Sequence, residues 1–206
     1  MGHCSSSQCI RKMIEIERKF VFTNNTVAQL LNAGARLVKE IELTDEYYDT
    51  DDFKMTLADF WLRRRNEKWQ LKCPVAGHSS NAGSLLYGSV YREVDDIDEI
   101  LELLRPLLKA TSTLTDNGIL ANYLRLNICS VFATICTHRM SYELDGFNVD
   151  LDCTDSGYQI GEIEVMVPDE SHIKEAEKRI KLFAEKMGNS RFCAYVELIQ
   201  LKILVN

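Results

Sequence analysis

Three segments of this sequence place two carboxylates at alternating positions, and this spacing has a chemical meaning. In a β-strand, residues two apart lie on the same face, so the two carboxylates of each segment share a face. Paired carboxylate oxygens are typical ligands of a hard cation such as Mg²⁺, which favours sites that also hold substrate phosphate. The pairs are Glu15 with Glu17, Asp150 with Asp152, and Glu162 with Glu164.

Basic residues recur on other strand-like segments with the same alternation. Guanidinium groups bind phosphate oxygens bidentately. A charged face on any single strand is more often simply solvated, but the whole set favours a charged barrel interior that binds a metal-bridged polyphosphate. In the segment WLRRR, Trp61 shares the face of two of these basic residues. The basic residues are Lys19, Arg63, Arg65, Lys72 and Arg139.

The elements that carry these side chains are expected to be mostly strands. Period-2 alternation and the turn signals Asn66-Glu67-Lys68 and Asp145-Gly146 predict strands over 14–20, 35–50, 60–74, 90–94, 129–153 and 158–167. Helices are predicted within 23–34, capped by Asn25 or Thr26, and within 95–109 and 168–188. Residues 111–128 receive no assignment, and 194–205 fit either helix or strand.

The order of these elements predicts the fold class. About eight strands with helices between some of them, and no βαβ rhythm, indicate an α+β fold with a mostly antiparallel sheet. Eight strands are also the number that closes a small barrel. With 206 residues, the chain suits one domain, which we expect over 13–206 after a flexible extension at 1–12.

Composition excludes several functional classes. The formal net charge of −7 disfavours a nucleic-acid-binding surface. The seven cysteines form no C-x-x-C pair, which indicates reduced thiols rather than disulfides or a zinc site. No apolar run reaches the roughly 20 residues that span a bilayer. We therefore expect a soluble, cytoplasmic monomer.

The N-terminal segment MGHCSSSQC matches the loose pattern of a myristoylation site, with Gly2 and Ser6 at the required positions and Cys4 as a palmitoylation target. Such short patterns match often by accident, so a flexible extension is the preferred interpretation. Membrane attachment is expected only if this N-terminus is acylated.

Eight short segments resemble, in order, the CYTH superfamily, whose members are the triphosphate tunnel metalloenzymes. The resemblance covers about residues 14 to 187, and DFWLRRRNEKWQLKCP and VDLDCTDSGYQIGEIE are most similar to the animal thiamine-triphosphatase branch. A lone E-x-E-x-K motif is weak, whereas eight segments in order are specific. The segments are EIERKF, YYDT, LADFWLRRR, WQLKCP, YREV, THRMSYEL, VDLD and GYQIGEIE.

This resemblance implies a closed eight-stranded antiparallel β-barrel, the triphosphate tunnel, with flanking helices. It implies a Mg²⁺-dependent hydrolase, with Mn²⁺ as a substitute, that acts on a small-molecule triphosphate, here thiamine triphosphate. The implied metal ligands are Glu15, Glu17, Asp150, Glu162 and Glu164, with Asp152 as a helper. The implied phosphate-binding residues are Lys19, Arg63, Arg65, Lys72 and Arg139, with Glu93 among them.

The expected reaction is attack of water on the terminal phosphoanhydride. The resemblance suggests Tyr47 and Lys72 as a proton-accepting pair, because a lysine crowded by arginines should have a lowered pKa. The alternative is that Lys72 only binds phosphate. Trp61 is expected to stack on the cationic thiazolium ring, whereas Trp69, on another face, is expected in the core.

Other functions of the same fold stay open at this point. An inorganic tripolyphosphatase needs no organic pocket, and a non-catalytic polyphosphate-binding module needs no metal site. RNA triphosphatases and class IV adenylyl cyclases share the tunnel as well. The sequence also departs from the thiamine-triphosphatase branch, since Tyr195 stands where that branch has a phosphate-binding lysine and Lys202 comes later.

Overall fold

The computed structural model describes residues 13–75, 89–108 and 119–187. The N-terminal extension with its acylation pattern lies outside these residues, as do the segment 194–205 and the end of the last predicted helix at Gly188. In the described segments, no helix is both long and apolar enough to cross a membrane.

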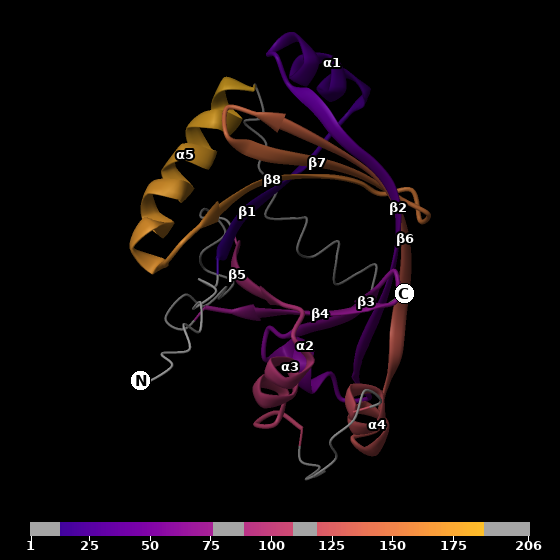
Figure 1. The fold of residues 1–206 in the computed structure, drawn as a ribbon. Helices are drawn as coiled ribbons and strands as arrows, with labels where there is room; N and C mark the ends of the chain where they lie inside the picture. Colours follow the sequence, from indigo (N-terminus) through magenta and orange to yellow (C-terminus); the bar gives the residue numbers. More distant parts are fainter. Residues whose placement is uncertain (1–12, 76–88, 109–118, 188–206) are drawn as a thin grey trace, which may run out of the picture.

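Eight strands of the described residues close into an antiparallel barrel (Figure 1). Their order around the barrel is β1-β5-β4-β3-β2-β6-β7-β8, so β1 closes it by pairing with both β5 and β8. This confirms the predicted closed barrel. The strands are β1 (Ile14–Val21), β2 (Arg36–Thr50), β3 (Trp61–Arg65), β4 (Lys68–Pro74), β5 (Ser89–Val94), β6 (Cys129–Leu144), β7 (Phe147–Thr154) and β8 (Gln159–Val167).

Two tight hairpins form where the sequence predicts them. Asn66 and Glu67 have φ of 44° and 69° between β3 and β4, and Asp145 and Gly146 have φ of 53° and 80° between β6 and β7. Two consecutive residues with positive φ suit the two-residue turns whose twist matches that of the flanking strands. These turns help to set the register of the paired strands, and with it which side chains face the interior.

Helices cover the outside of the barrel on two sides (Figure 1). The helix α5 (Ile173–Lys186), which follows the 3₁₀ turn η1 (Glu170–His172), packs on β1 and β8, and its Phe183 ring lies 4.6 Å from the Phe147 ring of β7. On the other side, α2 (Lys54–Leu57), α3 (Ile97–Leu104) and α4 (Ile119–Leu126) share an apolar cluster with β3 and β4.

The two apolar clusters explain why the interior can be charged. Each strand alternates between two faces, and the apolar faces of most strands are buried against the helices, as for Leu62 and Leu71 under α2, α3 and α4. The opposite faces point into the barrel. Burial of apolar surface outside the barrel therefore stabilises the fold and leaves the interior to polar side chains.

One local expectation, the N-cap of the first helix, was wrong, and the structure adds a helix where none was assigned. The helix α1 (Asn24–Asn32) is capped by Thr23, and the Thr26 hydroxyl accepts from the Thr23 backbone N–H at 3.1 Å, so Thr26 is the returning partner of a capping box. The helix α4 lies in the stretch that received no assignment. It buries Leu120, Tyr123 and Leu124, and such a short helix is stabilised by packing rather than by propensity.

Candidate active site

The strand register brings the charged faces together inside the barrel. Glu17 lies opposite Glu164 and Lys19 opposite Glu162 across β1 and β8, and Glu162 lies opposite Asp150 across β8 and β7. Directly opposite residues of antiparallel strands project to the same face. Glu17 and Asp150 are only 2% and 3% exposed. The charged faces predicted by strand parity therefore do line one interior.

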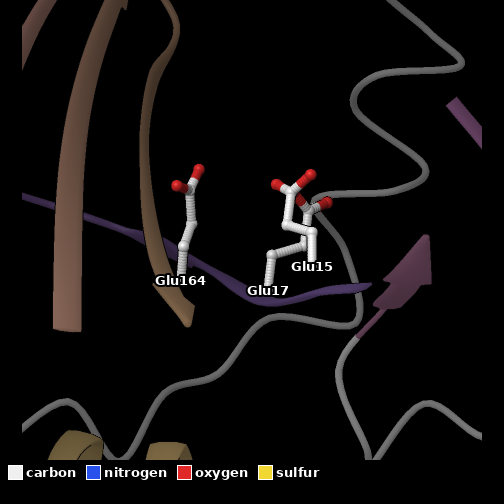
Figure 2. A group of neighbouring side chains, drawn as sticks. All are labelled: Glu15, Glu17 and Glu164. Carbon is white, nitrogen blue, oxygen red and sulfur yellow. The ribbon is translucent and has the colours of Figure 1, made fainter. Parts of the chain in front are cut away.

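The carboxylates form two groups that fit a metal ion. One oxygen each from Glu15, Glu17 and Glu164 lie within 4.8 Å of one another, and Asp150, Glu162 and Glu164 form a second such group. Figure 2 shows the first group, with the side chains of β1 and β8 projecting in the same direction and their carboxylates close together. Both groups contain only carboxylate oxygens, the ligand type that Mg²⁺ and Mn²⁺ prefer. The residues present thus fit a hard divalent cation, and Glu164 belongs to both groups.

Burial of these carboxylates changes their acidity. Burial raises the pKa of Glu15 to about 7, although the Lys72 ammonium opposes it. Burial and the surrounding carboxylates raise the pKa of Glu164 to about 8. For Glu17, burial is outweighed by the two lysine ammonium groups beside it, so its pKa falls to about 2. The interior therefore holds carboxyl groups that bind protons near neutral pH and would release them to bind a cation.

We expect Mg²⁺ to raise Tm more at about pH 9 than at about pH 6. The folded-state pKa values of Glu15 and Glu164, about 7 and about 8, lie above the ordinary value of 4.5. These two groups therefore stabilise the metal-free fold fully below the ordinary pKa, and that contribution is lost as pH rises through their folded-state pKa values. Mg²⁺ needs the deprotonated forms, so it restores stability where they prevail.

Thermal unfolding with and without Mg²⁺ at the two pH values measures this effect. Replacement of Glu164 by Gln removes the group with the higher pKa, so the pH dependence of the Mg²⁺ shift should shrink in that variant. Equal Mg²⁺ shifts in Tm at both pH values would contradict the expectation.

Arg139 neutralises one side of the carboxylate cluster. Its Nη1 lies 2.5 Å from Asp150, its Nε and Nη2 donate to the two oxygens of Asp152 at 2.7 and 2.6 Å, and its Nη2 donates to Glu162 at 3.1 Å. Asp152 lies outside both three-carboxylate groups found among the described residues. Its two oxygens orient the Arg139 fork, which also contacts Asp150 and Glu162 of the second group.

Lys19 bridges the same cluster from β1. Its ammonium lies 3.1 Å from Glu17 and also forms an ion pair with Glu162. Burial lowers its pKa, but the two carboxylates outweigh burial and hold the pKa well above the ordinary value. Lys19 is therefore a fixed cation next to the carboxylates, at the position expected for a phosphate ligand.

Arg63 and Arg65 meet an acidic residue that sequence reasoning missed. The Arg65 Nε and Nη2 donate to the two oxygens of Asp45 at 2.7 and 2.6 Å, and Arg63 Nη1 lies 4.0 Å from the same carboxylate. Asp45 is 4% exposed. Arg63 Nη2 also donates to Glu93 at 2.8 Å, so Glu93 lies among the basic residues as expected.

The expected lowering of the Lys72 pKa is wrong. Lys72 Nζ lies 3.1 Å from Glu15 and 2.8 Å from Glu17, so its nearest charges are carboxylates rather than arginines. Burial lowers the pKa of Lys72, but these two carboxylates more than offset burial and raise it above the ordinary value. Beside these two carboxylates Lys72 is therefore a protonated cation.

The structure also locates the remaining residues of interest. Tyr47 lies opposite Arg63 across β2 and β3, so the two side chains project to the same interior face. Trp61 lies opposite Lys72 and hence faces the interior, and its Nε1 donates to Asp59 at 3.0 Å. Trp69 packs on Tyr48 with ring centroids 4.8 Å apart and lies half-buried against the second apolar cluster, at the edge of the core in which it was expected.

Four polar residues of the site were not predicted, and strand parity could have found three of them. Asn148 precedes Asp150 by two and donates to Asp150 and Glu164 at 3.1 Å each. Gln70 precedes Lys72 by two and accepts from Arg63 Nε at 3.0 Å. Asp45 precedes Tyr47 by two in the same way. The fourth, Asp59, lies before β3, where no periodicity signals it.

Comparison with known proteins gives the same family as the sequence motifs. The family model for the CYTH domain matches residues 13–192. The chain belongs to the CYTH family. Within it, thiamine-triphosphatase from Homo sapiens is 32% identical over 186 residues, which cover 85% of this chain and 78% of the human protein. Thiamine-triphosphatase from Macaca fascicularis matches with the same identity and coverage.

Solved structures share the CYTH barrel at low sequence identity. A protein from Pyrococcus horikoshii superposes with a TM-score of 0.59 at 19% identity, covering 91% of this chain and 99% of that one. A conserved protein from Pyrococcus furiosus gives a TM-score of 0.56 at 20% identity, covering 86% and 92%. These likenesses concern the fold. Membership of the CYTH family, with its thiamine-triphosphatase relatives, supports a triphosphate hydrolase.

Proposed function

We propose that this CYTH protein hydrolyses thiamine triphosphate to thiamine diphosphate and phosphate, with Mg²⁺ as cofactor and Mn²⁺ as a substitute. The observation that carries the proposal is the pair of three-carboxylate groups facing five basic side chains inside a closed barrel. A polyphosphate bound through a metal ion is the ligand that needs both the carboxylates, which bind the metal, and the basic side chains, which bind the phosphates. The 32% identity to human thiamine-triphosphatase supports the choice of substrate.

The two groups that share Glu164 would hold the cation, with Glu15 and Glu17 on one side and Asp150 and Glu162 on the other. When bound, Mg²⁺ would neutralise charge on the phosphate oxygens and act as a Lewis acid. The Asn148 amide donates to Asp150 and to Glu164. It would therefore orient Asp150 in the second group and Glu164, which belongs to both groups.

Lys19, Arg63, Arg65 and Arg139 would bind the phosphate oxygens. These cations are paired with carboxylates, and no buried side-chain nitrogen or oxygen of the described residues lacks a hydrogen-bond partner. A triphosphate offers the same cations an alternative set of anionic oxygens. The basic residues then stabilise the charge that spreads over the transferring phosphoryl group.

Tyr47 and Lys72 are proposed to accept the proton of the attacking water. The Glu15 and Glu17 carboxylates beside Lys72 raise its pKa and so hold its proton. Lys72 can therefore act as a base only when the charges of these two carboxylates are neutralised. Tyr47 lies next to Arg63, which would orient its oxygen.

Trp61 is proposed to bind the organic end of the substrate. It shares the interior face with Arg63 and Lys72, and the electron-rich face of an indole attracts a cationic ring such as thiazolium. Inorganic tripolyphosphate has no such ring. Trp61 is thus the side chain that would make the site bind thiamine triphosphate more tightly than inorganic tripolyphosphate.

The test is phosphate release by the purified chain in Mg²⁺ with thiamine triphosphate, inorganic tripolyphosphate and ATP in parallel. We expect the wild type to hydrolyse thiamine triphosphate in preference to the other two compounds, and Glu15→Gln to lose this hydrolysis. In Trp61→Ala, the ratio of the rate with thiamine triphosphate to the rate with tripolyphosphate should fall about tenfold. A preference for tripolyphosphate that is unchanged in Trp61→Ala would make the chain a tripolyphosphatase. Tight binding without turnover of any substrate would make it a non-catalytic module.

We also propose that the protein acts as a cytoplasmic monomer on this small molecule, without nucleic acid. The support is the acidic net charge of −7 and the absence of C-x-x-C pairs among the seven cysteines.

A further inference from the structure

A half-buried hydrogen-bond group lies beside the proposed site for the organic end of the substrate. The Asp59 Oδ1 accepts from Trp61 Nε1 at 3.0 Å and from the Tyr91 hydroxyl at 2.9 Å. One carboxylate oxygen thus binds the polar edges of two aromatic side chains from two different strands, β3 and β5. Neither Asp59 nor Tyr91 belongs to the metal or phosphate groups described above.

The backbone around Asp59 is built to hold this carboxylate in place. Asp59 has φ of 63°, a left-handed conformation that side chains other than glycine adopt at some cost. Its N–H donates to the Thr56 carbonyl at 3.0 Å, and the Phe60 N–H donates to the Met55 carbonyl at 2.9 Å. Met55 is fully buried. The short helix α2 therefore anchors the residue that reaches Trp61 and Tyr91.

The group is connected to the phosphate end of the site through Lys72. On β4, Lys72 lies opposite Trp61 of β3 on one side and opposite Glu93 of β5 on the other. Its Nζ lies 5.9 Å from the centroid of the Tyr91 ring, within the range of a cation–π contact. Trp61 and Tyr91 thus flank a lysine that is proposed to act at the phosphates.

We propose that Asp59 is a positioning residue that makes the site selective for substrates with a cationic aromatic ring. By fixing Trp61 Nε1 and the Tyr91 hydroxyl on one oxygen, Asp59 holds the indole at a set orientation beside Lys72. The inference deepens the proposed function and rests on it, since thiamine triphosphate carries the ring that this platform would bind.

The physical reason is pre-organisation. An unrestrained indole rotates about its side-chain bonds, and a ligand that stacks on it must first order it. Hydrogen bonds from both aromatic side chains to one acceptor oxygen provide that order before the ligand binds. Hydrolysis of the phosphoanhydride itself does not use this group, so loss of Asp59 should affect binding of the organic end more than the chemical step.

The kinetic test compares Asp59→Ala with Asp59→Asn, because Asn keeps an oxygen that can accept both hydrogen bonds. We expect Asp59→Ala to raise KM for thiamine triphosphate about tenfold with kcat nearly retained, and Asp59→Asn to stay within about twofold of the wild type. If Asn impairs binding as much as Ala, the negative charge and not positioning is what matters, and the proposal is wrong.

Two further variants keep the test valid if Asp59→Ala folds poorly. Tyr91→Phe and Trp61→Phe each keep an aromatic ring but remove one donor to Asp59. Each should raise KM by a few fold, and Asp59→Ala combined with Tyr91→Phe should be no worse than Asp59→Ala alone, because both remove the same hydrogen bond. Additive effects on KM would mean that Asp59 and Tyr91 act independently, which overturns the proposal.

A binding measurement separates this proposal from the proposed function. The chain has two tryptophans, so in a Trp69→Phe background Trp61 is the one indole, and its fluorescence quenching by thiamine diphosphate reports binding directly. We expect Asp59→Ala to raise the Kd in this assay about tenfold. Equal Kd values with and without Asp59 would overturn the positioning role even if thiamine triphosphate is hydrolysed. Absence of turnover with an Asp59-dependent Kd would overturn the proposed function alone.

Discussion

Replacement of Glu164 by Gln is expected to lower kcat about 10²- to 10³-fold. Glu164 is the one carboxylate that the structure places in both three-carboxylate groups, and its removal weakens each of them. Gln keeps the shape and an oxygen that can accept from Asn148, whose amide lies 3.1 Å from Glu164, so the loss reports charge rather than packing. Burial, together with the surrounding carboxylates, raises the pKa of Glu164 to about 8, and a bound cation would oppose both effects.

The measurement is phosphate release as a function of Mg²⁺ concentration for the wild type and Glu164→Gln. The matched control is Glu67→Gln, which makes the same chemical change in the β3–β4 turn, where the Glu67 side chain is 89% exposed. We expect the control to match the wild type and Glu164→Gln to need far more Mg²⁺. A Glu164→Gln variant with wild-type kcat and Mg²⁺ dependence would remove Glu164 from the metal site.

Replacement of Lys72 by Arg is expected to lower kcat by about 100-fold or more. Arg retains a cation that can pair with Glu15 and Glu17, which lie 3.1 and 2.8 Å from the Lys72 ammonium, but it does not lose its proton in proteins. The substitution therefore keeps the phosphate-binding charge and removes the capacity to accept a proton. The loss should appear in kcat with little change in KM.

Lys72→Met, which removes both the charge and the proton site, provides the comparison. We expect Lys72→Met to impair KM as well as kcat, whereas Lys72→Arg impairs kcat alone. If Lys72→Arg keeps most of the turnover, Lys72 is a fixed cation that binds phosphate, and the proton must leave by another route.

The interior face was predictable because strand geometry has a simple period. Glu15 and Glu17, like Glu162 and Glu164, had to share a face once their segments were strands, and closure of the barrel then brings these faces together. The same parity argument, applied to the residue two before Tyr47, would have included Asp45. The alternation of β2 therefore already contains the signal that places Asp45 on the interior face.

Other features depend on contacts between strands and loops that no local pattern contains. The predicted direction of the Lys72 pKa shift was wrong because the partners of Lys72, Glu15 and Glu17, come from β1. In the barrel, β5 lies between β1 and β4, so no local pattern pairs these residues. Asp59 acts from a turn with φ of 63°, and its two aromatic partners lie on strands that β4 separates. The helix α4 is stabilised by packing of its buried face in the second apolar cluster. The other members of that cluster come from distant parts of the sequence, so the local sequence alone does not predict this helix.

The most direct test of the central claim is to follow thiamine triphosphate by ³¹P NMR in the presence of the purified chain and Mg²⁺. The proposed function predicts that the signals of thiamine diphosphate and orthophosphate grow in equal amounts, and that both grow about 100-fold or more slowly with Glu164→Gln. Release of pyrophosphate with thiamine monophosphate would place the cleavage at the wrong bond, and an unchanged spectrum would show no hydrolysis. Either result would contradict terminal phosphoanhydride hydrolysis by this barrel.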